Sequence, residues 1–248
     1  LSYNTGNENT CIGNQSLYSS TTASYNTVVG SASLVPLING AQNVGLGYTA
    51  GNYYATNQNV KNSDNSIFIG SGCNSDNDSQ TNQVVIGNGA VGKGNNTVRI
   101  GNTSVTNIGG QVAWSIPSDV RLKKDIKDSQ YGLNFINKLR PVTYKMKTGT
   151  TDLQSGFIAQ EVEAAANSLH YQFSGIVKPQ TAADFYSLRY SEFVVPLVKA
   201  VQDQQKLIEE QQKNMQEQQK KISGQRKLAE ERQKLLASKT AKLEEMEN

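Results

Sequence analysis

The chain has 248 residues, of which 36% are hydrophobic and 18% are charged, and its mean hydropathy is −0.53. This composition is too polar for one large packed core, so it favours an elongated chain that associates with its own copies. The net charge is only +3 without a basic patch, and no apolar run is long enough to cross a bilayer, so we expect neither a nucleic-acid partner nor a membrane span.

The first 110 residues contain an internal repeat that is marked in three ways. An apolar residue followed by Gly occurs six times, at Ile12-Gly13, Val29-Gly30, Leu46-Gly47, Ile69-Gly70, Ile86-Gly87 and Ile100-Gly101. The Asn residues that precede these pairs are Asn9, Asn26, Asn43, Asn65, Asn82 and Asn96, and the small residues three positions after each Gly are Ser16, Ser33, Ala50, Cys73, Ala90 and Ser104. Markers that coincide over six copies indicate a true repeat.

These repeats predict a parallel β-solenoid over residues 1–110. Short runs such as 66–69 and 83–86 have the composition of strands and are bounded by Asn, Gly and Ser. Coils this short bury no face alone, so each coil must stack on its neighbours. The one long interval between repeats, over residues 51–65, predicts a surface loop.

The Asn-x-x-Ile-Gly units of this array resemble the left-handed parallel β-roll in the heads of trimeric adhesins. The resemblance covers residues 1–110 and implies a trimeric head that binds a host-surface receptor or a glycan. The alternative is a structural shaft with no ligand of its own, because no cluster of convergent polar residues stands out in the repeats.

The cysteines and the single histidine predict no metal site. Cys11 and Cys73 lie far apart and have no His or Cys neighbour at ligand spacing, so we expect free, packed thiols. His170 has no evident partner for a Ser/His/Asp triad, and no pair of carboxylates indicates a glycosidase. We therefore expect no cofactor.

Residues 111–117 form a junction, in which Trp114 and Ile116 are expected to pack. At Ser118 the nearly uncharged repeats give way to a charged segment, and Lys123 follows that serine by five positions. This pattern has two interpretations. It marks a site at which the chain cuts itself, or Ser118 and the Asp after it merely cap a helix.

The segment 118–192 predicts a small α+β unit. Apolar spacing favours a helix within residues 129–138 and a strand within residues 139–146. A second helix is expected to begin with the run 156–166, and a strand over 185–190 leads into the terminal helix.

Four motifs occur in this unit and the helix after it. They are Ser118-Asp119-x-Arg121-x-Lys123, Leu139-Arg140-Pro141-Val142-x-Tyr144, Gly156-Phe157-Ile158-Ala159-Gln160-Glu161-Val162, and Tyr190-Ser191 ahead of Lys199-Ala200-Val201-Gln202. Together they resemble the C-terminal intramolecular chaperone domains of phage tail spikes and fibres, of the peptidase S74 type. Members of that family promote folding and trimer assembly of the fibre before them, and many then release themselves. A similar module occurs in myelin regulatory factor-like membrane proteins, but the repeats upstream favour a viral fibre.

The resemblance implies that the chain is a self-cleaving serine endopeptidase that cuts its own Pro117–Ser118 bond. Ser118 would be the nucleophile and Lys123 the general base. The other motif positions carried over from the family are Asp119, Arg121, Gly156, Gln160 and Glu161. A lysine accepts a proton only when it is neutral, so a lowered lysine pKa is required.

The charges around Lys123 act in both directions on its pKa. Nearby Arg121, Lys124 and Lys127 disfavour its charged form, whereas nearby acidic residues favour that form. The five-residue spacing also does not bring Ser118 and Lys123 together on a regular helix, because facing positions on a helix are three or four residues apart. A five-residue step needs a turn before the helix, or a lysine from another chain.

Residues 193–248 predict a coiled-coil helix. An apolar residue or Ala recurs every seven positions, at Val194, Val201, Ile208, Met215, Ile222, Ala229, Leu236 and Leu243. The heptads indicate self-association without fixing the number of strands, and the two resemblances imply three.

The sequence as a whole is interpreted as the C-terminal region of a homotrimeric viral fibre or tail spike. Its chaperone part would act in the infected host cell during assembly, and the solenoid would remain in the virion. The first alternative is a trimeric surface adhesin that retains an uncleaved C-terminal clamp. A second is a polysaccharide-degrading enzyme, which would need a carboxylate site upstream of Leu1 or across subunits.

Overall fold

The computed structural model describes residues 4–53, 59–147, 151–179 and 184–247, so part of the expected loop at 51–65 lies outside the described residues. The chain divides into two compact units. The first comprises Leu1–Pro117, Val142–Gly156 and Lys178–Tyr186, and the second comprises Ser118–Pro141, Phe157–Val177 and Ser187–Asn248.

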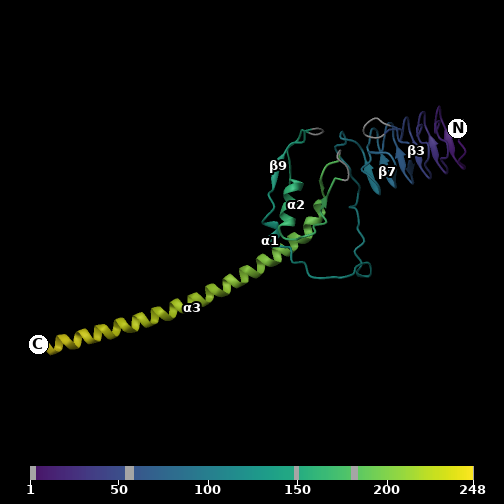
Figure 1. Ribbon diagram of the computed structural model, residues 1–248. Coiled ribbons are helices and arrows are strands. Elements are labelled where there is room, and N and C mark those ends of the chain that lie inside the picture. The colour runs from purple at the N-terminus through teal and green to yellow at the C-terminus, as the bar shows by residue number, and fades with distance from the viewer. Residues whose placement is uncertain (1–3, 54–58, 148–150, 180–183, 248) are drawn as a thin grey trace. The chain divides into compact units, whose positions relative to one another are not determined.

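The first unit contains a parallel β-solenoid whose strands stack as rungs (Figure 1). Its six-stranded sheet consists of β1 (Thr10–Ile12), β2 (Thr27–Val29), β3 (Val44–Leu46), β5 (Ile67–Ile69), β7 (Gln83–Ile86) and β8 (Thr97–Ile100). The register places Ile12 opposite Val29, and Ile69 opposite Ile86. A second, two-stranded parallel sheet joins β4 (Ser63–Asp64) to β6 (Gln80–Thr81). The predicted β-solenoid is therefore confirmed.

The core of the solenoid lies on the inner side of each rung. Val28, Phe68 and Val85 point inward from the strands and are fully buried, because alternate residues of a strand face opposite sides. The small residues expected at the inner corner are buried at Ser16, Ser33, Ala50, Cys73 and Ala90. Burial raises the pKa of the Cys73 thiol to about 11. Ser104 is exposed, because β8 is the last strand and no further rung covers it.

A ladder of buried amides runs through the first rungs. Asn26 and Asn43 are each 1% exposed, and the backbone N–H and Nδ2 of Asn43 both donate to Oδ1 of Asn26, at 2.9 and 3.0 Å. Ser66 and Gln83 occupy this buried position in the next two rungs. The Asn residues of the last three repeats, Asn65, Asn82 and Asn96, are instead exposed, with positive φ. The alignment of all six as one marker was wrong, because Asn suits both a buried ladder and a left-handed corner.

The second unit has an aromatic core beneath two short helices. It contains α1 (Leu133–Ile136) and α2 (Ala159–Asn167), and an antiparallel pair of β11 (Ile176–Val177) with β12 (Ser187–Leu188). Its buried residues are Phe135, Val162, Ala165, Ala166, Phe173 and Phe193. The predicted α+β character is thus observed.

Two elements of this region differ from the expected ranges. The first helix is short, because the chain before Leu133 is held in non-helical conformation at Gly132. A second helix was expected to begin with the run 156–166. Instead Gly156 ends strand β10 (Gln154–Gly156), which pairs with β9 (Val142–Tyr144), and the helix begins at Ala159.

A 3-10 turn, Tyr190–Phe193, leads into α3 (Val194–Glu247), a single helix of 54 residues (Figure 1). Its heptad positions are exposed at Val194, Val201, Ile208, Met215, Ile222, Ala229 and Leu236, and the side chain of Leu243 lies outside the described residues. Most helical stability in proteins comes from packing of an apolar face, and the described part of this chain does not cover these positions.

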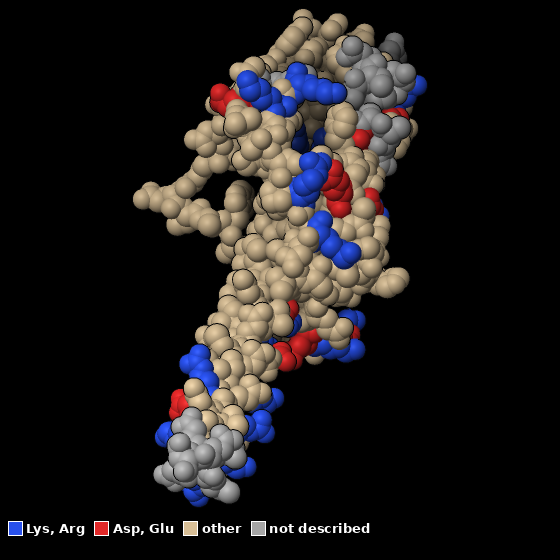
Figure 2. Space-filling view, turned by 90° about the vertical axis from the view of Figure 1, so that its left-hand side faces the viewer, with Lys and Arg blue, Asp and Glu red and all other residues tan. Residues whose placement is uncertain are grey.

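Charged side chains of both signs are visible on one face of the molecule. In Figure 2, basic side chains (blue) and acidic side chains (red) are mixed on the visible face, and both kinds also occur along the helix. Among the described helices, none is apolar over a length that would cross a bilayer. The described residues also contain no group of three or more His, Cys, Asp or Glu side chains placed to hold a metal ion.

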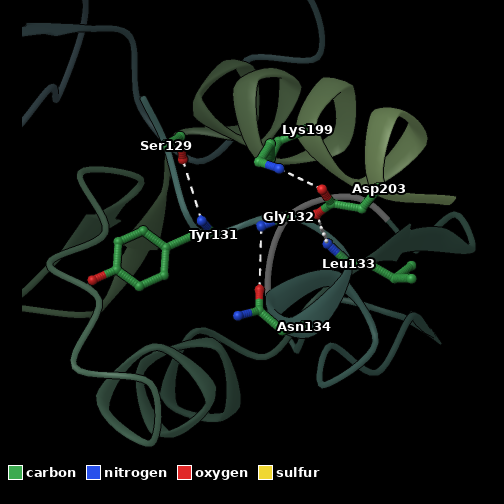
Figure 3. A network of polar contacts seen from close by, with 7 residues as sticks. All are labelled: Ser129, Tyr131, Gly132, Leu133, Asn134, Lys199 and Asp203. Carbon is green, nitrogen blue, oxygen red and sulfur yellow. Dashed lines mark hydrogen bonds and ion pairs between the residues drawn. The ribbon is translucent and has the colours of Figure 1, made fainter. Parts of the chain in front are cut away.

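One carboxylate fastens α1 to the beginning of α3 (Figure 3). Asp203 forms an ion pair with Lys199 one turn earlier, and its Oδ2 accepts the N–H of Leu133 at 3.4 Å. Within α1, Asn134 Oδ1 accepts only the N–H of Gly132, at 3.2 Å, so Asp203 caps Leu133 from another helix. Gly132 permits the approach, because a Cβ there would lie 2.9 Å from the backbone carbonyl carbon of Lys199.

We expect acid to weaken this clamp. The hydrogen bond from Lys199, together with the Leu133 N–H, holds the pKa of Asp203 below its usual value. A carboxyl group with a depressed folded-state pKa contributes stability above its unfolded pKa and loses it as pH falls through the folded pKa. Asp203→Asn should therefore lower the thermal stability of the second unit at neutral pH and flatten its acid dependence below about pH 4. Glu231→Gln, on the exposed part of α3, serves as control, and equal curves for both variants would contradict this role.

Candidate self-cleavage site

The site begins with a tight turn directly after Pro117. Asp119 has an extended backbone and caps a 3-10 turn, Val120–Leu122, by accepting the Arg121 N–H at 2.8 Å. The N–H of Leu122 then donates to the carbonyl of Asp119 at 3.1 Å. Lys123 leaves the turn in an extended conformation, with φ −113 and ψ 144. A capping aspartate therefore holds a single 3-10 turn between two extended residues, Asp119 and Lys123.

This turn brings the two residues of the candidate dyad together. Lys123 Nζ donates to Ser118 Oγ at 2.8 Å, and both residues belong to one chain. Within one chain, the turn is enough to span the five-residue step between Ser118 and Lys123. Asp119 also provides the cap considered above, so capping and the Ser–Lys contact occur together.

The cations near the dyad are partly compensated. Arg121 donates through Nε and Nη2 to the carboxylate of Asp119, at 3.0 and 2.7 Å. These bonds hold the pKa of Asp119 below its usual value and raise that of Arg121. Both groups are solvent-exposed, so the pair shapes the turn more than it stabilises the fold.

The chain on both sides of the Pro117–Ser118 bond is exposed. Every residue from 103 to 128 is exposed, including Trp114 at 88% and Ile116 at 74%. The expectation that these two side chains pack the junction was wrong for the single chain, since no described part of it covers them. The Pro117–Ser118 peptide bond therefore lies within a solvent-exposed segment.

The other motif positions lie on structural elements of their own. Glu161 on α2 forms an ion pair with Arg140, and Arg140 Nε lies 3.0 Å from Glu161 Oε2. This pairing holds the pKa of Glu161 below its usual value. Gln160 is exposed on α2, while Gly156 pairs with Val142 at the end of β10. The Arg140–Glu161 contact spans 21 residues, so spacing gave no sign of it.

The last motif also meets the third one in space. The N–H of Phe157 donates to the hydroxyl of Tyr190 at 3.1 Å, and the two rings stack with that of Phe193. Residues of the later motifs thus contact one another through the Arg140–Glu161 ion pair and the Phe157–Tyr190 contact, whereas Ser118 and Lys123 contact each other.

Comparison with known families identifies the segment that starts at this turn. Residues 118–170 match the Peptidase_S74 family model, which is described as chaperone of endosialidase. The match begins at Ser118, downstream of the β-solenoid whose last strand, β8, ends at Ile100, so the resemblance drawn from the motifs is confirmed for this segment. No curated protein and no solved structure matches the chain.

Proposed function

We propose that the chain is the C-terminal region of a homotrimeric viral fibre or tail spike that assembles through, and then releases, its own chaperone. The observation that carries the proposal is the position of the S74-type segment. It begins at Ser118, downstream of a β-solenoid whose last strand ends at Ile100, and Ser118 Oγ lies 2.8 Å from Lys123 Nζ.

The chemistry proposed for the dyad is an N-to-O acyl shift followed by hydrolysis. Neutral Lys123 takes the hydroxyl proton of Ser118, and Oγ attacks the carbonyl carbon of Pro117. The C–N bond of Pro117–Ser118 breaks, the serine nitrogen takes a proton and an ester remains. Water then cleaves the ester, which leaves the Pro117 carboxylate and a chain that begins with Ser118.

The proposed chaperone role would help a solenoid that folds slowly by itself. Its rungs pair residues at least 14 positions apart, and stacking of this kind is slow because loop closure precedes any gain in contacts. Three α3 helices joined along their exposed seams would hold three solenoid chains in register while the rungs form. Cleavage at Ser118 would then separate the finished fibre from the trimerising helix.

The proposal also assigns partners and location. The solenoid would stay in the virion and present a surface to a host receptor or glycan, whereas the segment after Ser118 would act in the infected cell. The rival function is a surface adhesin whose clamp stays attached. It predicts a wild-type chain that remains in one piece.

The chaperone role is tested by refolding. The full chain carrying Ser118→Ala and a chain that ends at Pro117 are denatured, diluted and treated with protease. We expect a protease-resistant solenoid only from the full chain. Equal recovery of the solenoid from both would contradict the chaperone role, whatever happens at the cleavage site.

A further inference from the structure

The carboxylate next to the candidate nucleophile has both of its oxygens bound by one arginine. Arg121 donates its backbone N–H and its Nε to Oδ1 of Asp119, at 2.8 and 3.0 Å, and its Nη2 to Oδ2 at 2.7 Å. The two side-chain bonds are the fork-like contact in which a guanidinium group binds a carboxylate. Lys123 forms no ion pair among the described residues, and its Nζ donates to Ser118 Oγ.

Asp119 is a natural competitor of Ser118 for this lysine. It follows Ser118 directly and lies four positions before Lys123, and the flexible stem of a lysine lets its amine move between acceptors on adjacent residues. Lys199 and Asp203, also four positions apart, form an ion pair in this chain. An ionised carboxylate is a stronger acceptor for an ammonium group than a neutral hydroxyl is. Nζ nevertheless contacts the hydroxyl.

The other charged groups near Lys123 belong to the same exposed segment. Every residue from 103 to 128 is exposed, and the 3-10 turn Val120–Leu122 contains no buried residue. The charged neighbours of Lys123 on this segment are Asp119, Arg121, Lys124, Asp125, Lys127 and Asp128. Of the three acidic groups, Asp119 is the one adjacent to Ser118, so it is the one that competes for the amine at the dyad itself.

We propose that Arg121 is a positioning residue for the Ser118–Lys123 dyad and acts by occupying the Asp119 carboxylate. The inference rests on the proposed self-cleavage and concerns a residue that does not touch the reacting atoms. With the arginine in place, the amine remains on Ser118 Oγ, where its neutral form takes the hydroxyl proton. Without the arginine, the free carboxylate attracts the amine away from Ser118 and favours its charged form, which cannot act as a base.

The test is the rate of self-cleavage as a function of pH. The full chain is made briefly by cell-free synthesis and diluted into buffers between about pH 6 and 10, which spans the titration of a lysine side chain. The fragments 1–117 and 118–248 are followed on a denaturing gel. We expect Arg121→Gln to cleave roughly two- to fivefold more slowly than wild type at neutral pH, the size expected for an exposed ion pair. Its rate should approach that of wild type at the alkaline end, because a neutral amine is no longer drawn to the carboxylate.

The double variant Asp119→Asn, Arg121→Gln separates positioning from a merely structural role. Asparagine retains the acceptor that caps the turn but lacks the charge that attracts Lys123, so this variant should regain the wild-type pH profile. A structural role of the Arg121–Asp119 pair predicts instead that the double variant cleaves no faster than Arg121→Gln. Lys124→Gln, which also removes one positive charge but leaves the pair intact, is the matched control and should keep the wild-type profile.

The results separate this inference from the proposed function. If wild type cleaves itself and Arg121→Gln has the same pH profile as Lys124→Gln, Arg121 is not a positioning residue and self-cleavage stands. A double variant as slow as Arg121→Gln overturns the inference in the same way. A wild-type chain that stays intact at every pH would overturn both the self-cleavage and the role of Arg121.

Discussion

Replacing Lys123 by methionine should leave the Pro117–Ser118 bond uncut over the time in which we expect the wild-type chain to cut itself. Methionine keeps most of the side-chain length but cannot take the proton from Ser118 Oγ, which lies 2.8 Å from Nζ in the structure. A positioned general base contributes roughly 10²- to 10⁴-fold to such a reaction. Ser118→Ala, which removes the nucleophile, should abolish cleavage entirely.

The measurement is a denaturing gel of freshly purified protein, followed over days. Lys124→Met is the matched control, because it removes one positive charge at the next position and leaves the Ser118–Lys123 contact in place. We expect Lys124→Met to release the fragments 1–117 and 118–248 at a rate near that of the wild type. Rapid cleavage of Lys123→Met would show that this lysine is not the base.

Gly47→Ala should prevent the solenoid from folding. Gly47 has φ +132, which residues with a side chain rarely adopt, and a Cβ there would lie 2.8 Å from the carbonyl carbon of Gly70 in the next rung. That neighbour is backbone and is fixed by the β3–β5 pairing, so it has no room to retreat. The cost exceeds the roughly 1–3 kcal/mol of backbone strain alone, and the rungs on both sides lose their register.

Gly72→Ala provides the control for backbone strain without a clash. Gly72 also has a positive φ, +63, but a Cβ there meets nothing within 4 Å. We expect it to fold, with a loss of about 1–2 kcal/mol. Limited proteolysis and circular dichroism of both variants would distinguish the two cases. A native solenoid in Gly47→Ala would contradict the close stacking of the glycine column.

Repeated local chemistry made the solenoid predictable. The apolar-Gly pairs were aligned by sequence, and the strands pair with the same residues opposite one another, from Ile12 to Ile100. The Asn markers were less informative, since Asn43 is buried in a ladder while Asn65 lies at an exposed corner. Asn is a suitable residue at the buried ladder position and also at the neighbouring corner position. The composition of a repeat therefore does not tell which of the two positions its Asn occupies.

The site was only partly predictable for a different reason. The motifs identified Ser118 and Lys123, but their contact depends on a 3-10 turn held by Asp119 and on the extended backbone at Lys123. Such a short irregular turn has no periodicity. The contact of Asp203 with the N-terminus of α1 likewise joins positions 70 residues apart, and no local sequence pattern predicts it.

The central claim is that Ser118 cuts the bond before it, and the masses of the products from purified wild-type protein test this most directly. We expect two species, one that ends at Pro117 and one that begins with Ser118, and a single intact species from Ser118→Ala. A wild-type chain that keeps its full mass after assembly, or fragments that begin at any other residue, would contradict the account.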